Sequence, residues 1–229
     1  QTVKHVLALI KRIIRFGVHK GLCDAPDPRK LTIVMPRVDN ETTEDLDPEE
    51  LARLIQSIED EPNIQAANFM KLALFTGMRR GELFKLEWRD GDFERGFLHI
   101  RHPKGGQSQK IPLNDAAKAV LESHPHVEGT PFVFPGQGGK QRVTIQVASN
   151  RIKARAGLPA EFRPMHGLRH LFASTLASSG QVDMLTLQKL LTHKSANMTK
   201  RYAHLRDDAM RRASDVAGRI FGRIGVGGQ

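Results

Sequence analysis

The chain has 229 residues and a formal net charge of +10 at pH 7, and hydrophobic residues make up 39% of it. This apolar content can build the core of one large domain. No apolar run approaches the ~20 residues that a spanning helix needs, which argues against a membrane protein. The single cysteine, Cys23, excludes an internal disulfide and a thiolate zinc cluster, and is typical of a reducing cytoplasm.

The positive charge is distributed unevenly. Residues 1–40 carry eight Lys or Arg against three Asp or Glu, residues 41–62 carry one against nine, and residues 63–229 carry 26 against 13. A basic balance of this kind favours a polyanionic partner such as nucleic acid, because binding releases counterions. A solvated basic surface is an equally good explanation of the charge by itself.

The first predicted element is an amphipathic helix over residues 2–19. Apolar side chains recur at helical spacing, with basic ones between them, a pattern unlike a signal peptide. The stretch from Cys23 to Leu46 has three prolines and mixed charges, which predicts an extended linker. A lone helix before a linker has nothing to cover its apolar stripe. Since the chain also starts at Gln1 rather than Met, we expect a truncated upstream domain.

Two longer helices and a short one open the next domain. The run Asp47-Pro48-Glu49-Glu50 combines an N-cap, a proline at the first helical position and acids in the first turn. A second helix is predicted from about residue 63 to 75, ending at Thr76-Gly77, where glycine suits a left-handed exit. The short helix follows through Glu82 to Leu86.

The periodicity then changes to that of strands. Three short strands are predicted at Phe93, over 97–101 and over 110–113, with turns at Gly96 and Gly105-Gly106. Further helices are predicted over residues 114–123, 144–156, 167–178, 183–191, 196–203 and 206–221. The predicted fold class is α+β, mostly helical, with a small three-stranded antiparallel sheet.

Tyr202 is the only tyrosine of the chain and stands nine residues after His193. A phenol has an unperturbed pKa of about 10, so it attacks only where a base or dense positive charge favours the phenolate. Considered alone, a tyrosine is more often a packing residue with a hydrogen-bonded hydroxyl.

The run H-G-L-R-H places His166, Arg169 and His170 at i, i+3 and i+4, on one face of a helix. A histidine pair at i, i+4 suits zinc, but the zinc motif has Glu directly after the first His, whereas Gly167 follows here. A guanidinium flanked by imidazoles suits two oxygens of a phosphate. The plainer interpretation is a helical arginine in an ion pair.

Two more cations complete the candidate set. Arg79 lies just beyond the helix end at Gly77, where it can project into a cleft with Glu82 to orient it, or simply decorate a helix start. Lys104 follows Pro103 at the tip of the second predicted hairpin. A lysine there can protonate a leaving oxygen, although it more often contacts solvent or a backbone phosphate.

In this order, these residues resemble the catalytic domain of the tyrosine recombinase (phage integrase) family. The resemblance covers about residues 46–205, and it makes residues 1–25 the end of a truncated core-binding domain, 26–46 a linker and 47–229 the catalytic domain. Gly167 departs from the family pattern, which usually has Asp, and we expect the loss of that side chain to modulate activity. The matching segments are T-G-M-R-R-G-E, P-K-G-G-Q-S-Q-K-I-P-L, H-G-L-R-H and L-L-T-H-K-S-A-N-M-T-K-R-Y-A-H-L.

The resemblance implies a site-specific recombinase that cleaves and rejoins DNA through a covalent 3′-phosphotyrosyl intermediate. Tyr202 would be the nucleophile, Arg79 and Arg169 would clamp the nonbridging phosphate oxygens, and Lys104 would protonate the leaving 5′-oxygen. His166 would accept the phenol proton.

The resemblance assigns the remaining histidine of the site and two supporting residues. His193 would donate to a phosphate oxygen, Glu82 would position Arg79, and His170 would support the site indirectly. No metal or nucleotide cofactor is expected. The expected partners are the attachment sites of a mobile element such as a phage, three more copies of the chain on paired sites, and an accessory DNA-bending protein; free protein is expected to be monomeric.

Three alternatives remain open from the sequence. A type IB topoisomerase shares the chemistry but would relax supercoils without pairing two sites. A DNA-binding protein with a decayed active site would keep the charge and lose the reaction. A metallohydrolase built on His166 and His170 is the most remote.

Overall fold

The computed structural model describes residues 2–37, 45–101 and 108–206, and beyond these only positions 210–211, 214–216 and 218–219. The chain divides into two compact units, residues 1–42 and 43–229. Across the described residues, no helix combines the length and the apolar character needed to cross a bilayer. The domain boundaries expected from the resemblance stay a prediction.

The described part of the first unit is built around helix α1 (Thr2–His19), as the periodicity predicted. No side chain of α1 is buried, and its apolar face is open to solvent, with Val3 64% exposed and Ile13 60% exposed. The helix ends at His19, and Gly21 in the turn that follows has a φ of +67°. Residues 23–37 contain no helix or strand.

Local capping explains where the first two helices of the second unit begin and end. Helix α2 (Pro48–Glu59) starts with a capping box, in which Asp47 Oδ1 accepts from the Glu50 amide at 2.7 Å and Glu50 Oε2 accepts from the Asp47 amide at 3.0 Å. Helix α3 (Ile64–Thr76) is capped by the Asn63 side chain and ends at Gly77, with φ +63°. Both agree with the sequence prediction.

A small antiparallel sheet follows the short helix α4 (Arg80–Leu83) and the 3₁₀ turn η1 (Trp88–Asp90). Its strands are β1 (Gly91–Asp92), β2 (Phe97–Ile100) and β3 (Gln109–Pro112), in that order, with Leu98 paired with Ile111. The predicted first strand at Phe93 was wrong: the strand ends at Asp92, whose carboxylate accepts from the Arg95 amide at 3.1 Å and so turns the chain early.

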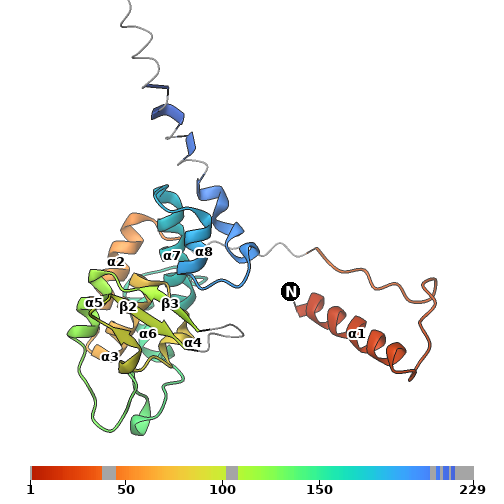
Figure 1. Cartoon of the computed structure of the whole chain (residues 1–229), viewed down its shortest axis with the longest axis horizontal. Helices are drawn as coiled ribbons and strands as arrows, with labels where there is room; N and C mark the ends of the chain where they lie inside the picture. Colours follow the sequence, from red (N-terminus) through yellow and green to blue (C-terminus); the bar gives the residue numbers. More distant parts are fainter. Residues whose placement is uncertain are drawn as a thin grey trace, which may run out of the picture. The chain divides into compact units, whose positions relative to one another are not determined.

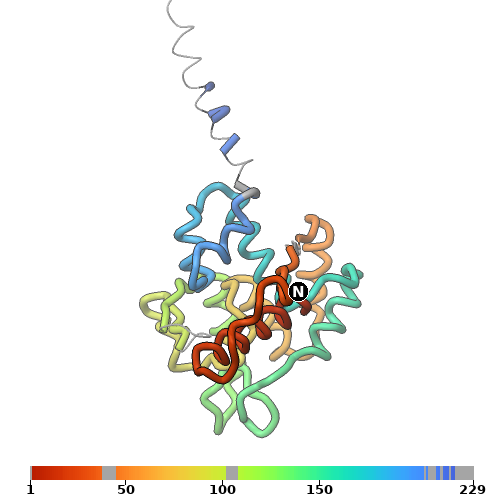
Figure 2. Tube along the Cα trace, turned by 90° about the vertical axis from the view of Figure 1, so that its right-hand side faces the viewer, coloured from red at the N-terminus to blue at the C-terminus, as the bar shows by residue number. Residues whose placement is uncertain are grey.

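The rest of the second unit is helical. Helix α5 (Asp115–Glu122) is capped by Asn114, and η2 (Gln137–Gly139) precedes α6 (Gln146–Arg155). Helix α7 (Pro164–Ser179) begins three residues before the prediction, at a proline in its first turn, and α8 (Met184–Leu190) follows. In both views α8 and the segment after it lie beside α7 at one end of the unit (Figures 1 and 2).

The predicted α-helix over residues 196–203 was wrong. The chain forms two 3₁₀ segments there, η3 (Ala196–Met198) and η4 (Lys200–Arg206). Their amides bond three residues back, as in Thr199 to Ala196 and Tyr202 to Thr199. The side chain of Thr199 is held by His193, which fixes the break between the segments. Within the predicted helix over 206–221, the described positions 210–211, 214–216 and 218–219 are helical, and the other positions after 206 lie outside the described residues.

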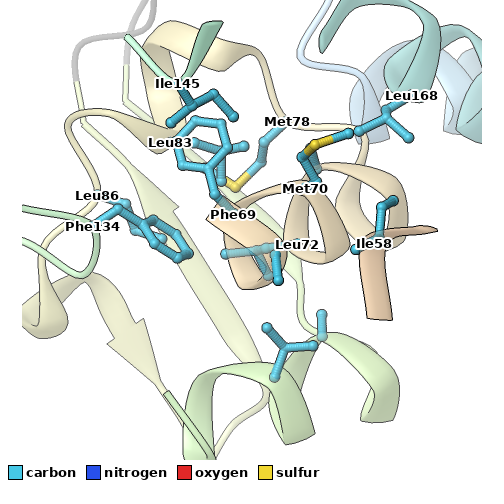
Figure 3. Close-up of a cluster of buried hydrophobic side chains, with 14 of the residues drawn as sticks. Ile58, Phe69, Met70, Leu72, Met78, Leu83, Leu86, Phe134, Ile145 and Leu168 are labelled. Carbon is cyan, nitrogen blue, oxygen red and sulfur yellow. The ribbon is translucent and has the colours of Figure 1, made fainter. Parts of the chain in front are cut away.

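Helix α3 is the centre of the core. Its apolar side chains are spread around the helix, which packs against both α5 and α7. Figure 3 shows Phe69, Met70 and Leu72 of α3 among apolar side chains from other elements, including Leu83, Phe134, Ile145 and Leu168. A second, smaller cluster joins α7, α8 and η4, and its buried members are Ala173, Ala177, Leu187, Leu191 and Tyr202.

Gly167 faces a packed aromatic ring. A Cβ built on Gly167 would lie 2.3 Å from Cε2 of Phe162, which is itself only 4% exposed. Any larger residue there must displace Phe162, which gives a packing reason for glycine at a position where the family pattern has Asp.

Gly167→Ala should therefore lower the free energy of unfolding by about 1–3 kcal/mol through overpacking, measured by urea denaturation. Gly81→Ala is the matched control, because Gly81 is also helical but a Cβ added there would meet nothing within 4 Å. We expect no loss there, or a gain of about 0.5–1 kcal/mol. Equal losses in the two variants would contradict the packing explanation.

Candidate active site

Two turns that are far apart in sequence are joined by two arginines. Arg169, on α7 and 8% exposed, donates from Nη1 to the carbonyl of Gly77 at 2.5 Å and from Nη2 to the carbonyl of Leu191. Arg79 donates from Nη1 to Oγ1 of Thr192 at 2.5 Å and from Nη2 to the Thr192 carbonyl at 3.2 Å. The chain around 77–79, α7 and the turn after α8 therefore form one site.

Glu82 lies against Arg79. The Glu82 carboxylate accepts from the Arg79 amide at 2.9 Å and from Arg79 Nη1 at 2.9 Å. The carboxylate is nearly buried, with 7% of its side chain exposed against 28% for Arg79. The Glu82 carboxylate therefore holds both the backbone amide and the guanidinium of Arg79.

The two guanidiniums are cations that the protein only partly neutralises. Burial, and then repulsion by Arg79, lowers the pKa of Arg169 to about 10, while Glu82 and Tyr202 act in the opposite direction. Arg169 is still protonated at neutral pH. Gly77 and Leu191 offer it backbone carbonyls rather than carboxylates, so these two contacts do not cancel its positive charge.

Tyr202 is in contact with His170 rather than with His166. Its hydroxyl lies 2.6 Å from His170 Nδ1, and His170 Nε2 lies 2.8 Å from His166 Nε2. Tyr202 is 3% exposed and His170 is 3% exposed, whereas His166 is exposed. The sequence interpretation placed His166 next to the phenol and gave His170 an indirect role; the structure inserts His170 between them, because η4 approaches α7 one turn further along.

His170 is neutral at physiological pH. Burial, and then repulsion by His166, lowers the pKa of His170 to about 3. A neutral imidazole has one donor and one acceptor nitrogen. If Nδ1 accepts from the phenol, Nε2 carries the proton that is shared with His166, so the three groups can form a continuous chain from Tyr202 to the surface.

His193 follows Thr192 and lies half-buried beside both arginines. Its Nδ1 is 2.8 Å from Oγ1 of Thr199. Burial, and then repulsion by Arg169 and Arg79, lowers the pKa of His193 to about 3. When the Thr199 hydroxyl donates to Nδ1, the other nitrogen carries the proton, which leaves His193 able to act as a hydrogen-bond donor.

A cavity of roughly 730 Å³ opens next to these residues. Its described lining includes no Asp or Glu and has contributions from α4, α6 and α7. Such a surface suits an anionic backbone. Tyr202 is not in this lining. The cationic members and the histidine are Arg79, Arg80, Lys153, Arg163, Arg169 and His166.

Helix α6 supplies one wall of the cavity through Gln146, Asn150 and Lys153. On its opposite side, the helix is paired with Glu61, which lies just beyond the end of α2. The fully buried carboxylate of Glu61 pairs with Arg151 and, at 3.4 Å, with Arg155. The hydrogen bond from Arg151 is the largest cause of the lowered pKa of Glu61, and burial opposes it. Sequence reasoning did not single out α6, because its polar residues form no motif.

Two sequence hypotheses remain, the role of Lys104 and the metal site. Lys104 lies outside the described residues, so its role stays a prediction. In the described ranges no three His, Cys, Asp or Glu side chains gather as metal ligands. Sequence reasoning missed Thr192, although one signal was present: the predicted helix ended at residue 191, which puts a threonine where glycine is usual.

Comparisons with known proteins show the family to which the chain belongs. A sequence profile described as "Phage integrase family" matches residues 44–209, which include every site residue described above. The chain belongs to the phage integrase family. Within this family, the chain is 30% identical over 207 residues to a shufflon-specific DNA recombinase of Escherichia coli, covering 90% of the chain and 51% of the relative.

Further relatives place this integrase-family chain among the tyrosine recombinases. It is 32% identical over 190 residues to tyrosine recombinase XerC of Xanthomonas campestris pv. campestris (strain B100), covering 80% of the chain and 58% of the relative. The chain thus spans about half the length of the curated relatives it matches.

Solved structures share the fold. One is the XerH site-specific recombinase bound to palindromic difH substrate in a post-cleavage complex, with 25% identity, a TM-score of 0.61, and coverage of 76% of this chain and 53% of that one. Another is the Tn1549 transposon integrase in complex with a circular intermediate DNA, with a TM-score of 0.73 at 19% identity, covering 93% of this chain and 79% of that one.

Two histidines of the site, His170 and His193, have strongly lowered pKa values, which predicts a stability that depends on pH. The unfolded chain, with histidine pKa near 6.5, binds more protons than the folded chain down to about pH 3. The free energy of unfolding should therefore fall as pH falls below about 6.5, by up to ~1.4 kcal/mol per pH unit for each histidine.

Urea unfolding from about pH 7.5 to about pH 5 measures this slope. His193→Asn should flatten it, whereas His19→Asn, which changes an exposed histidine of α1, should leave it as in the wild type. The explanation fails if the wild-type slope in this range is flat, or if the two variants change it equally.

Proposed function

We propose that the chain is the catalytic part of a site-specific DNA recombinase that cleaves and rejoins DNA through a 3′-phosphotyrosyl intermediate. The observation that carries the proposal is the convergence of Arg79, Arg169 and Tyr202, from three distant segments, on one cluster beside a cation-lined cavity. The relationship to tyrosine recombinases supports the same reaction class.

The chemistry follows from the charge of a phosphodiester. An anionic backbone repels nucleophiles, so fixed cations must bind the nonbridging oxygens as negative charge builds on them. Arg79 and Arg169 take this role, with His193 as a neutral donor. The bond from the Tyr202 oxygen to phosphorus forms as the bond to the 5′-oxygen breaks, and Lys104 protonates that oxygen. The phosphotyrosyl bond retains the energy of the broken phosphodiester. The 5′-hydroxyl of a partner strand then attacks the phosphorus, which forms a new phosphodiester and releases Tyr202.

The phenol proton leaves through His170 in this proposal. The contact between the Tyr202 hydroxyl and His170 Nδ1, and that between His170 and His166, support a transfer in which His170 takes the proton at Nδ1 and gives one up at Nε2 to His166. Because Tyr202 is buried behind His170, attack on a phosphate in the cavity also requires η4 to shift.

The partners follow from the reaction. The substrate is double-stranded DNA at the attachment sites of a mobile element. Exchange between two duplexes needs four copies of the protein, assembled from monomers, and an accessory DNA-bending protein is a further partner. Exposed Cys23 is compatible with work in the bacterial cytoplasm.

The first test is covalent capture of DNA. Wild-type protein is mixed with a pool of nicked duplexes that carry a randomised core, and a linked fragment is located by mass spectrometry. We expect an adduct at Tyr202 and none with Tyr202→Phe, because the phenylalanine variant keeps the packing and lacks the attacking oxygen. An adduct that persists in Tyr202→Phe refutes the assigned nucleophile.

A plasmid assay with the captured DNA sequence then distinguishes recombination from topoisomerase activity. A plasmid carrying two copies of the captured sequence should yield recombinant products. Relaxed plasmid without recombinants would favour the type IB topoisomerase alternative.

The relay through His170 has its own test. His170→Asn should slow adduct formation by about 10²–10⁴-fold, as expected for loss of a proton acceptor, measured in a single turnover. His99→Asn, which alters a histidine of β2 outside this cluster, should react at the wild-type rate. A wild-type rate in His170→Asn would assign the proton to another group.

A further inference from the structure

Thr192 has an unusual backbone conformation. Its φ is +50°, and it is the only non-glycine residue with positive φ in the described ranges. A β-branched side chain is strained in this region, because its branches crowd the backbone. Glycine adopts the same conformation freely.

The conformation belongs to the end of α8. The Thr192 amide bonds to the Lys189 carbonyl at 2.9 Å and the His193 amide to the Gln188 carbonyl at 3.0 Å, the pair of bonds that defines a Schellman motif. Thr192 occupies the left-handed position of this motif, where glycine is usual. A strained residue that persists at a site where an unstrained one would fit points to a role for its side chain.

The side chain of Thr192 is used by Arg79. Thr192 is 4% exposed, and its Oγ1 accepts from Arg79 Nη1 at 2.5 Å while its carbonyl accepts from Nη2 at 3.2 Å. Glu82 accepts from Nη1 at 2.9 Å. These contacts engage three of the five N–H groups of the guanidinium, and Arg79 also lines the cavity.

Three contacts on one side of a planar group fix its orientation. Because the guanidinium is rigid, holding Nη1 and one hydrogen of Nη2 determines where the other two N–H groups point. The hydroxyl also differs in kind from a carboxylate. It accepts a hydrogen bond without adding negative charge. Glu82 is therefore the only one of these two acceptor residues that offsets the positive charge of Arg79.

We infer that Thr192 is a positioning residue for Arg79: its hydroxyl, presented by a strained turn, holds the guanidinium so that the two N–H groups that no described residue binds serve the phosphate. The consequence for DNA cleavage rests on the proposed function. The turn also carries Leu191, whose carbonyl accepts from Arg169, and His193. Thr192 thus ties Arg79 to the turn that holds the other phosphate-binding groups.

Three substitutions of Thr192 distinguish the effect of its hydroxyl from the effect of its backbone strain. Thr192→Ser keeps the hydroxyl, Thr192→Val keeps the branched shape without it, and Thr192→Gly removes both the hydroxyl and the strain. If the role is positioning, activity follows the hydroxyl: serine is close to wild type, and valine and glycine lose cleavage rate by about ten- to a hundredfold. Stability follows the strain instead, so the glycine variant should melt a few degrees above the valine variant.

Two measurements are made on the full chain. Side-chain ¹⁵N–¹H NMR of the arginines reports rotation about the Cζ–N bonds of Arg79, with Arg79→Lys to assign its signals. Slow rotation is expected in wild type and Thr192→Ser, and fast rotation in the valine and glycine variants. Single-turnover adduct formation on the duplexes captured by wild-type protein gives the cleavage rates.

The outcomes distinguish the two proposals. If wild-type protein forms no adduct, the proposed function fails, and the NMR comparison by itself decides whether Thr192 holds Arg79. If wild type forms an adduct, the inference is overturned when the valine variant cleaves as fast as the serine variant, or when cleavage rates follow the melting temperatures instead of the hydroxyl. Unchanged Arg79 rotation in the valine variant also overturns it.

Discussion

The site depends on holding two like charges close together inside the protein. Arg169 is nearly buried, and its cation is paired with carbonyl oxygens of Gly77 and Leu191. Carbonyl groups solvate a guanidinium without neutralising it, so the charge remains for an incoming anion. The same bonds fasten the end of α3 to the end of α8, and a change in either turn would move Arg169. The hydrogen bonds that join these two turns are therefore the ones that orient Arg169, the residue proposed to bind phosphate.

The two hydrophobic clusters have different roles in this arrangement. The large one, centred on α3, fixes the helices that carry Arg79 and Arg169 and supports the sheet. The small one joins only α7, α8 and η4, and it includes the ring of Tyr202. The residue proposed as the nucleophile is thus also a packing residue of the small cluster. Its departure from His170 would leave an unfilled space against Leu187 and Leu191, which favours the buried position until a bound partner compensates.

Local sequence signals predicted the helices whose ends are set by local chemistry. Asp47, Asn63 and Asn114 each cap a helix through their own side chain, so the chain near them is sufficient to place the start. The region after α8 was mispredicted because its form depends on a side-chain contact between His193 and Thr199, which helical periodicity does not show. The spacing of the two histidines on α7 showed that they share a face, but it could not show which one η4 approaches. That choice is tertiary, as is the contact between Thr192 and Arg79.

The contact between Gly167 and Phe162 makes the side chain allowed at one position depend on the side chain at the other. The ring fills the volume that a side chain at position 167 would need, and Phe162 lines the same cavity as Arg79. A larger side chain at position 167 of this chain would therefore require a smaller or differently placed side chain at position 162. In this chain the space is filled by an apolar ring instead of a carboxylate, which makes the wall of the cavity more positive.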